Sequence, residues 1–448
     1  MPIRRPLRTE RHRPESHRRQ PPRPPRRLRR RLNSLALASM PGEALGVIVV
    51  VGILSVFGLI MVASASAQPS VASYGNSWQF SVLQGFFLVL GVALAGVVAK
   101  VRYDVWRRYA FFGVLGSLAS LLLVFFVSPT VGGAQRWLPL KIINVQPSEF
   151  AKLIVVIWVA HFVAKQLSGR PTQAALVIPT LGIAAAFFVL IYLEPDLGTA
   201  SIVVLSVLTI LLIGGISIQW FMPICGAGLL VGAVAILASS YQRARISNLF
   251  DQGHHWLGGN YQLHQSKTAI GSGGLFGQGL GQGTFKWGAI PNPHTDFIFS
   301  VIGEEFGLIG TVGVLVLFMV LVGLGIRIAT RAPSHYGAFL AMGITTWLGL
   351  QTLINVASVV GFFPVTGVPL PFISYGGTSL VVDLMAAGLL VSVGLSIPRG
   401  RLTPVRDSAP EANDTRRRTT THRRTTVAAS STRGGSRRVP VTRPRSTR

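Results

Sequence analysis

Residues 293–326, "PHTDFIFSVIGEEFGLIGTVGVLVLFMVLVGLGI", join a polar turn that contains Asp296 to a long apolar segment. One helical crossing of a hydrocarbon core needs about 20 apolar residues. We therefore expect a membrane span over 297–326. Charge next to hydrocarbon is costly and is usually retained for function. Asp296, Glu304 and Glu305, at the start of this span, are therefore candidates for chemistry.

Apolar runs of similar length recur along the chain. Of its 448 residues, 49% are hydrophobic and only 13% are charged, whereas soluble domains carry about 25% charged residues. Because only helices and closed barrels satisfy the backbone in lipid, runs near 20 residues indicate helices. The sequence predicts an all-α polytopic integral membrane protein with about ten transmembrane helices, at 45–66, 80–99, 109–128, 147–164, 173–193, 197–214, 219–239, 297–326, 337–361 and 376–397.

The net charge of +27 comes mainly from two tails. Thirteen arginines lie in residues 1–32 and fourteen in 399–448, so the tails hold 27 of the 42 basic residues. Both tails lack apolar periodicity, which predicts disorder. We divide the chain into a basic N-terminal tail (1–44), a ten-span transmembrane domain (45–397) and a basic C-terminal tail (398–448). Because no folded nucleic-acid module accompanies the arginines, we expect attraction to anionic membrane lipids and no nucleic-acid partner.

The loops between the spans indicate the orientation. An even number of spans places both termini on one side, and basic loops favour the cytoplasmic side. The loops 67–79 and 362–375 lack Lys and Arg, whereas residues 100–108 carry four. We therefore expect a multi-pass plasma-membrane protein with both termini cytoplasmic. The longest outer loop, 240–296, lies between spans 7 and 8, and loops of this length are usually functional or disordered.

Two polar groups lie at predicted outer ends of spans. In "GAQRWLPLKIINVQPSEFAKL" (133–153), Glu149 and Lys152 are three residues apart, so they share a helix face and can neutralise one another. They either orient helices as an ion pair or bind a ligand, together with Arg136 upstream. In "LEPDLGTA", Asp196 is either an N-terminal cap of the next helix or a functional carboxylate.

The segment 361–379, "GFFPVTGVPLPFISYGGTS", is too rich in proline and glycine to continue a helix. Irregular backbone at membrane depth is tolerated only where it is buried in protein or lines a cavity. The amides around Ser374, Gly376 and Gly377, at the start of the last span, are placed to hold a phosphate or carbonyl oxygen. A purely structural kink is the alternative.

Asp296 is separated from the carboxylates that follow it. If 296–307 is helical, Glu304 lies roughly 80° around and about 12 Å along the axis from Asp296, and Glu305 faces the opposite side. This excludes the closely spaced carboxylate pair of glycoside hydrolases. A single carboxylate suffices to deprotonate an attacking hydroxyl when a leaving group such as pyrophosphate departs unprotonated. The candidate ligands for pyrophosphate are Arg136, Lys152, Arg243, Arg245 and Lys267.

The remaining patterns predict no zinc or dinucleotide site. No zinc-ligand spacing joins the outer histidines, which are His254, His255, His264 and His294. The stretch "GSGGLFGQGLG" lacks the βαβ surroundings of a dinucleotide motif, and residues 261–283 instead predict a short helix and a glycine-rich turn on the outer surface. A divalent cation, Mg or Mn, held by Asp296 and a pyrophosphate is an open expectation. The single cysteine, Cys225, excludes an intramolecular disulfide.

Six motifs together resemble the SEDS family of bacterial cell-wall proteins: "GAQRWL", "QPSEFAKL", "EPDLGTA", "QSKTAIGSGGLFGQG", "HTDFIFSVIGEEFG" and "PVTGVPLPFISYGGTS". Their order and the ten-span layout are similar to those of the family over about 45–397. The motifs "PVTGVPLPFISYGG" and "QSKTAIGSGGLFGQG" look more like those of the elongation member, RodA, than those of the division member, FtsW.

The resemblance implies a peptidoglycan glycosyltransferase that joins lipid II into β-1,4-linked glycan strands outside the bacterial plasma membrane and releases undecaprenyl pyrophosphate. It places the catalytic aspartate at Asp296 and other important positions at Arg136, Glu149, Lys152 and Asp196. The implied partners are lipid II, the growing glycan strand, membrane lipids and a class B penicillin-binding protein, which is a transpeptidase. A lipid II flippase and a non-catalytic scaffold are the alternative functions.

Two residues depart from the family pattern. Asp383 lies in the last span where relatives commonly carry an amide, and Glu194 precedes "PDLGT" where a neutral polar residue is common. An acid within a span is costly and usually faces protein or a cavity. Asp383 therefore leaves a proton-coupled role open.

Overall fold

The computed structural model describes residues 40–128, 135–140, 143–169, 172–250, 259–285 and 293–398. The expected disorder of the two tails falls almost wholly outside these residues, and so do His254 and His255. The elements, in chain order, are α2 (Gly42–Ala65), α3 (Ala67–Tyr74), α4 (Gln79–Lys100), η1 (Tyr103–Val105), α5 (Trp106–Val127), β1 (Leu138–Leu140), β2 (Ile143–Val145), α6 (Pro147–Leu167), α7 (Gln173–Leu193), α8 (Leu197–Ile213), α9 (Ile218–Ala238), α10 (Ser240–Phe250), α11 (Gly259–Ser272), α12 (Ile298–Arg331), α13 (His335–Val360) and α14 (Gly377–Leu395).

Within the described ranges, nine helices are long and apolar enough to cross a membrane. They match nine of the ten expected spans, and the remaining span, 197–214, is the apolar helix α8 of 17 residues. At 1.5 Å per residue α8 is about 26 Å long, which is less than the roughly 30 Å hydrocarbon core. At least one end of α8 therefore lies inside the hydrocarbon layer that the longer helices cross completely. The predicted polytopic helical fold is confirmed, with the short antiparallel hairpin β1–β2 as an unpredicted addition.

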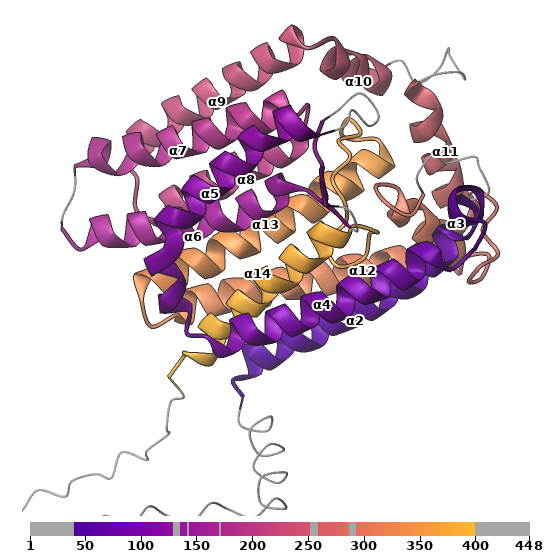
Figure 1. Cartoon of the computed structure of the whole chain (residues 1–448), viewed down its shortest axis with the longest axis horizontal. Coiled ribbons are helices and arrows are strands. Elements are labelled where there is room, and N and C mark those ends of the chain that lie inside the picture. The colour runs from indigo at the N-terminus through magenta and orange to yellow at the C-terminus, as the bar shows by residue number, and fades with distance from the viewer. Residues whose placement is uncertain are drawn as a thin grey trace, which may run out of the picture. The chain divides into compact units, whose positions relative to one another are not determined.

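Helix α14 lies at the centre of the bundle. It packs against α2, α4, α6 and α13, and 89% of its most apolar 18-residue window is buried. Helix α9 lies at the edge beside α10, with only 6% of the corresponding window buried (Figure 1). A helix that is apolar all round suits either a protein core or lipid. Burial, and not sequence periodicity, therefore distinguishes the core helix α14 from the lipid-facing helix α9.

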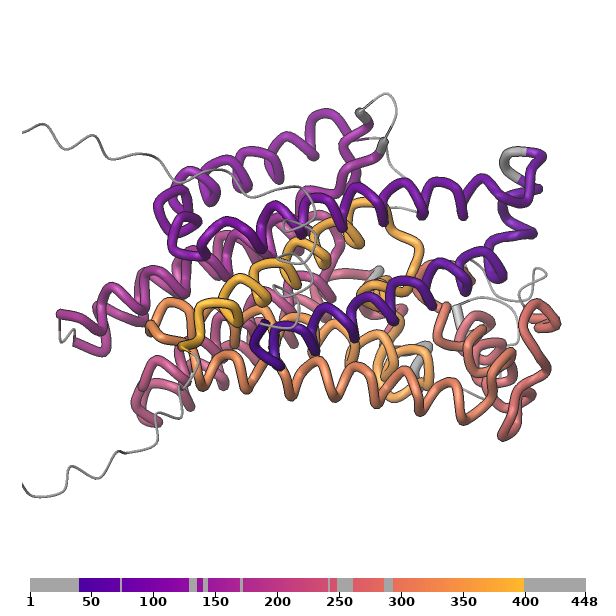
Figure 2. Tube along the Cα trace, turned by 90° about the horizontal axis from the view of Figure 1, so that it is seen from below, coloured from indigo at the N-terminus to yellow at the C-terminus, as the bar shows by residue number. Residues whose placement is uncertain are grey.

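The catalytic candidate lies at one end of the bundle and the described chain ends lie at the other. Arg331, the last residue of α12, forms an ion pair with Glu43 in the first turn of α2. At the opposite end of α12, the His294 carbonyl accepts a hydrogen bond from the Tyr375 amide, just before α14, at 2.8 Å. Figure 2 shows the long helices α2, α4 and α12 extending between these two ends. Asp296 therefore lies opposite the end at which the described chain begins and finishes.

Helix α12 is broken at Gly307, whose backbone angles (φ 65°, ψ −158°) suit glycine alone. The glycine-rich turn after α11 covers this break, and the Leu308 amide donates to the Gly274 carbonyl at 2.9 Å. A Cβ at Gly307 would lie only 2.5–2.6 Å from backbone atoms of the turn. The predicted short helix and glycine-rich turn are confirmed. The single span expected over 297–326 is instead two helical segments.

Candidate active site

Asp296 lies in the turn that leads into α12. The Asn355 side chain on α13 donates to the Asp296 carbonyl at 2.9 Å and to the Val368 carbonyl at 2.8 Å. These bonds join the turn to the irregular segment 361–376. A Cβ at Gly367, which has a φ of 76°, would lie 3.6 Å from Asp296 Oδ2. A Cβ would fit at this distance, so it is the positive φ that favours glycine at this position. The segment itself lies directly against the carboxylate.

The surroundings of Asp296 favour its protonated form. Burial raises the pKa of the Asp296 carboxyl above its ordinary value, while a hydrogen bond from the Thr295 side chain and the charges of Arg245 and Arg136 lower it. The charge of Asp196 raises this pKa further. The side chain of Asp296 is only half-buried. A carboxylate that is a stronger base than usual therefore remains accessible to a substrate.

Arg136 is held beside Asp296 by backbone carbonyls. Its Nε donates to the Glu194 carbonyl at 2.8 Å, and a terminal nitrogen donates to the Pro195 carbonyl. The Cβ position of Gly367, 3.6 Å from Asp296 Oδ2, is 4.0 Å from a terminal nitrogen of Arg136. The fold therefore brings together two candidate residues that are 160 positions apart in the sequence.

Asp196 begins α8 as its N-cap, accepting bonds from the Thr199 amide at 3.0 Å and the Thr199 hydroxyl at 2.9 Å. The capping alternative for Asp196 is therefore confirmed. Burial raises the pKa of the neighbouring Glu194 to about 9, helped by Asp196 and opposed by Arg136. Glu194 is therefore neutral at pH 7. The charge of Asp196 also acts on Asp296, although less than burial does.

The two glutamates that follow Asp296 serve the packing of α12. Glu304 accepts a hydrogen bond from the Phe285 amide of the glycine-rich turn at 3.1 Å. Glu305 accepts one from the Ser64 hydroxyl of α2 at 2.6 Å. These partners lie on different sides of α12. Asp296 lies in the turn before Ile298, where α12 begins, so the helix assumed over 296–307 does not include it and the expected separation stays a prediction.

Glu149 and Lys152 form a buried ion pair on α6. Lys152 Nζ lies 2.9 Å from Glu149 Oε2 and donates to Gln351 Oε1 of α13, also at 2.9 Å. The ammonium lies 5.1 Å from the centre of the Trp347 ring. Asp383 of α14 is buried close to this pair. The structure therefore favours the structural alternative for the pair, and an enclosed Lys152 is no longer a candidate pyrophosphate ligand.

Two of the three amides expected to bind an oxygen, those of Ser374 and Gly376, are used within the fold. The Ser374 amide donates to a carbonyl of the preceding turn at 3.0 Å, and the Gly376 amide donates to Gln84 Oε1 of α4 at 3.4 Å. A Cβ at Gly377 would lie 2.5 Å from the Phe87 ring, so glycine here permits packing against α4. We correct the expectation for Ser374 and Gly376, because their amides donate within the fold. For Gly377, which is half-buried, the expectation stays a prediction.

The three basic candidates of the outer loop occupy different places. Arg245 on α10 acts electrostatically on Asp296 and also lines a cavity of about 390 Å³. Arg243 is exposed on the same helix and is not part of the cavity wall. Lys267 on α11 lies against the Gly361 backbone at the end of α13. The structure therefore places Arg245, and not Arg243, beside Asp296.

The cavity beside Arg245 is mostly apolar. It lies between α8, α9, α10, α13 and the start of the irregular segment, and its other lining residues are Leu197, Gly198, Ser201, Ile236, Gln242, Ile246, Ile354 and Phe362–Thr366. One side of it is formed by α9, whose apolar window is the least buried of the candidate spans. A groove that joins a guanidinium to apolar walls suits an amphiphile with an anionic head and a hydrocarbon chain.

The described residues contain no ready-made metal cage. His294 packs between aromatic rings, with centroid distances of 4.8 Å to Phe80 and 5.4 Å to Tyr375. Burial lowers the pKa of His294 to about 4, so it is neutral at pH 7. Within the described ranges, no group of three or more His, Cys, Asp and Glu side chains is arranged to hold a metal ion. The divalent ion expected at Asp296 therefore stays a prediction.

Sequence reasoning does not identify Asn355, Gln351 or Gly367. Asn355 holds the turn of Asp296, and Gln351 holds Lys152. A signal was available for the two amides, because they lie four residues apart within an apolar span and polar residues in spans usually face protein. Gly367 carries no signal that separates it from the other glycines of its segment.

Comparisons with known proteins find relatives over most of the chain. Residues 45–396 match the FtsW/RodA/SpoVE family, described as cell cycle protein. Stage V sporulation protein E of Bacillus subtilis (strain 168) is 37% identical over 350 residues, which cover 77% of this chain and 95% of that protein. A probable peptidoglycan glycosyltransferase FtsW of Coxiella burnetii is 37% identical over 346 residues, covering 75% of this chain and 92% of that protein.

Solved structures show the same fold. The crystal structure of the rod shape determining protein RodA of Thermus thermophilus is similar with a TM-score of 0.58 and 28% identity, covering 79% of this chain and 96% of that chain. A chain from a peptidoglycan synthase complex that coordinates polymerization and crosslinking is similar with a TM-score of 0.65 and 28% identity. That match covers 78% of this chain and 96% of the other.

Proposed function

The chain belongs to the FtsW/RodA/SpoVE family, and on this premise we propose that it is a peptidoglycan glycosyltransferase that polymerises lipid II into β-1,4-linked glycan strands. Relatives named as probable peptidoglycan glycosyltransferases support this activity. The observation that carries the proposal is the accessible Asp296 carboxyl, with Arg136 and Arg245 beside it and an apolar groove adjoining Arg245.

The reaction follows from these groups. The Asp296 carboxylate accepts the proton of the acceptor sugar hydroxyl while the hydroxyl oxygen attacks the anomeric carbon of the donor. The bond between that carbon and the diphosphate oxygen breaks, and undecaprenyl diphosphate leaves with the bonding electrons. Arg136 and Arg245 stabilise the negative charge of the leaving group. A single attack from the opposite face converts an α-linked donor into a β-linked product.

The groove beside Arg245 supplies the place for the hydrocarbon chain of the substrate. Its walls come from α8, α9, α10 and α13, and α9 lies at the edge of the bundle. A polyprenyl chain in this groove keeps the diphosphate near Arg245 and Asp296. Holding the reacting groups together in this way lowers the entropic part of the barrier.

The protein is a multi-pass membrane protein. We assign the end of the bundle that holds Asp296 to the outside of the plasma membrane and both termini to the cytoplasm. Support comes from the basic loop at 100–108 and the uncharged loop 67–79, because basic loops favour the cytoplasmic side. The similar chain from a synthase complex supports a partner that crosslinks the strands, which we assign to the class B penicillin-binding proteins.

The role in elongation or in division is not distinguished by the site. The motifs resemble those of RodA, whereas the identity to the FtsW of Coxiella burnetii is 37% and that to the RodA structure is 28%. The preference for the elongation member therefore stays a prediction.

The proposed activity is tested with the purified full chain and lipid II in detergent, where no leaflet crossing is needed. We expect Asp296→Asn to lower polymer formation by at least about 100-fold, because general base catalysis contributes roughly 10²–10⁴-fold. Glu43→Gln, at the opposite end of the bundle, is the matched control and should retain activity. Polymerisation by a correctly folded Asp296→Asn chain at the original rate contradicts the mechanism.

The same assay separates the alternatives. A flippase makes no polymer from lipid II in detergent, so neither the original chain nor Asp296→Asn would give a product. A scaffold depends on its tails, so a chain that lacks 1–32 and 400–448 should still polymerise lipid II if the protein is the enzyme. We also propose that any divalent ion is carried by the diphosphate. Chelation by EDTA then stops polymerisation and added Mg or Mn restores it, whereas activity that is insensitive to EDTA excludes the ion.

A further inference from the structure

A second cavity lies at the end of the bundle opposite Asp296. It has a volume of about 700 Å³ and is formed where η1 and the start of α5 meet the end of α6. Lys165, near the end of α6, lies at this same end of the bundle as Glu43 and Arg331. None of the groups that line this cavity takes part in the proposed glycosyl transfer.

The lining of this cavity is strongly basic. It includes Arg102, Arg107, Arg108 and Lys165, with Asp104 as the acidic member. Asp104 forms ion pairs with Arg102 at 3.3 Å and with Arg107 at 3.9 Å. In the part of the chain that the structure describes, Arg108 and Lys165 have no carboxylate within ion-pair distance. The cavity therefore has positive charge in excess, and two of its cations are available for an anion.

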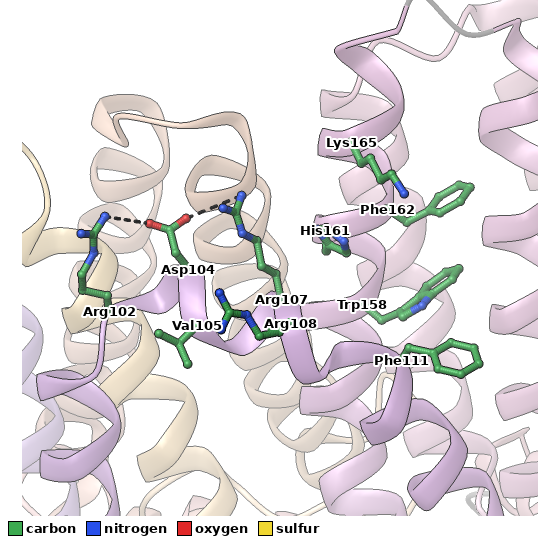
Figure 3. A pocket seen from close by; sticks show the side chains of 10 residues that line it. All are labelled: Arg102, Asp104, Val105, Arg107, Arg108, Phe111, Trp158, His161, Phe162 and Lys165. Atoms are coloured by element: carbon green, nitrogen blue, oxygen red, sulfur yellow. Dashed lines mark hydrogen bonds and ion pairs between the residues drawn. The ribbon is translucent and has the colours of Figure 1, made fainter.

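Aromatic side chains form the deeper wall. The Trp158 and Phe162 rings stack with a centroid distance of 5.1 Å and an interplanar angle of 7°. Figure 3 shows these rings and that of Phe111 in a column below Lys165, pointing to the side away from Arg102, Arg107 and Arg108. Phe111 is 65% exposed at the bundle surface. From Lys165 to Trp158 the helix covers about 10 Å, at 1.5 Å per residue.

The cavity thus changes from cationic at the helix ends to aromatic and lipid-facing further in. A phospholipid has the same order of groups, with a phosphate at the membrane surface and acyl chains below it. Basic pockets between transmembrane helices recognise anionic lipid headgroups in this way. Free phosphate would match the arginines but would leave the exposed Phe111 and the Trp158–Phe162 wall without a ligand.

We propose that this cavity, formed by Arg107, Arg108, Lys165 and the Trp158–Phe162 wall, binds the headgroup of an anionic phospholipid. The basic side chains of the lining hold the phosphate, and an acyl chain runs along the aromatic rings toward Phe111. A lipid at this place contacts η1, α5 and α6 together, and it is a ligand separate from the substrate of the glycosyl transfer.

The test measures retention of phosphatidylglycerol by the full chain in detergent, with native mass spectrometry over a lipid titration. Each basic side chain near a membrane surface contributes a factor of about five in affinity, so Arg108→Gln/Lys165→Gln should weaken retention roughly 30-fold. The control pair Lys100→Gln/Arg327→Gln removes equal charge from exposed residues at the same end, outside the cavity. The control should change retention less than about threefold.

The proposal is overturned if the cavity variant and the control variant lose lipid retention equally, or if neither loses any. If millimolar inorganic phosphate displaces the lipid, the ligand of the cavity is a free anion and the proposal of a phospholipid is overturned. A second measurement localises the lipid, because brominated phosphatidylglycerol quenches tryptophan fluorescence on contact. We expect less quenching in Trp158→Phe than in the original chain, and equal quenching contradicts the site. All variants must share the melting temperature of the original chain without lipid.

Discussion

Replacing Lys152 by methionine removes the cation of the buried pair with little change in side-chain volume. The side chains of Lys152 and Glu149 are 1% and 2% exposed, so water does not replace the lost ammonium. Asp383 lies close by and adds a second acid. Removing one partner of a buried ion pair costs about 3–5 kcal/mol. We expect Lys152→Met to lower the free energy of unfolding by that amount.

A double substitution separates the cost of leaving Glu149 charged and unpaired from the cost of lost packing. Lys152→Met/Glu149→Gln removes both charges, and we expect it to recover at least about 2 kcal/mol, because replacing a whole buried pair is often neutral. Lys165→Met, on the exposed end of the same helix, should change stability by less than about 0.5 kcal/mol. Unfolding by SDS in detergent micelles, followed by circular dichroism, measures all three. The reasoning is refuted if the free energy of unfolding of Lys152→Met lies within about 1 kcal/mol of that of the original chain. It is also refuted if the double variant is no more stable than Lys152→Met.

Gly307→Ala places a Cβ 2.5 Å from the Gly277 amide nitrogen, whereas Gly313 in the same helix has open space around it. In thermal unfolding we expect Gly307→Ala to lower the free energy of unfolding by about 1–3 kcal/mol. We expect Gly313→Ala to lower it little or not at all. Because the pKa of Asp296 is raised, polymerisation should fall as the pH drops through a value above the usual carboxyl range near 4, and an acid limb at or below about pH 4 contradicts this. The folded-state pKa of Glu194, about 9, exceeds its ordinary value of 4.5, so its contribution to stability is complete below that lower value and is lost as the pH rises toward 9. Glu194→Gln should flatten the decline in melting temperature over this interval, and an unchanged decline argues against a buried neutral acid.

The spans were predictable because the bilayer sets a length and a composition that each helix must satisfy alone. The turn at Asp296 was predictable for the same reason, since it lies where an apolar run begins. The Glu149–Lys152 pair follows from helical spacing, which is also a local property. Each of these predictions depends on residues that are close together in the sequence.

The contacts that complete the site join distant parts of the chain. Arg136 is held by the carbonyls of Glu194 and Pro195, and a backbone acceptor leaves no mark in the side-chain sequence. The break at Gly307 depends on the turn near Gly274, which supplies the missing hydrogen bonds. The Gly376 amide looked available because its partner, Gln84, lies on the distant helix α4. Local pattern therefore identifies the candidate residues, whereas tertiary contacts decide which of them are free to act.

The charge state of Glu194 connects the site to its proposed substrate. Arg136 and Arg245 carry two positive charges near Asp296, and Asp296 and Asp196 carry two negative charges when ionised. A third ionised carboxylate would give the site a net negative charge and would repel a diphosphate. Because burial raises the pKa of Glu194 to about 9, this acid stays neutral at pH 7. The apolar surroundings of Glu194 therefore leave the two guanidinium groups able to attract the anionic head of the substrate.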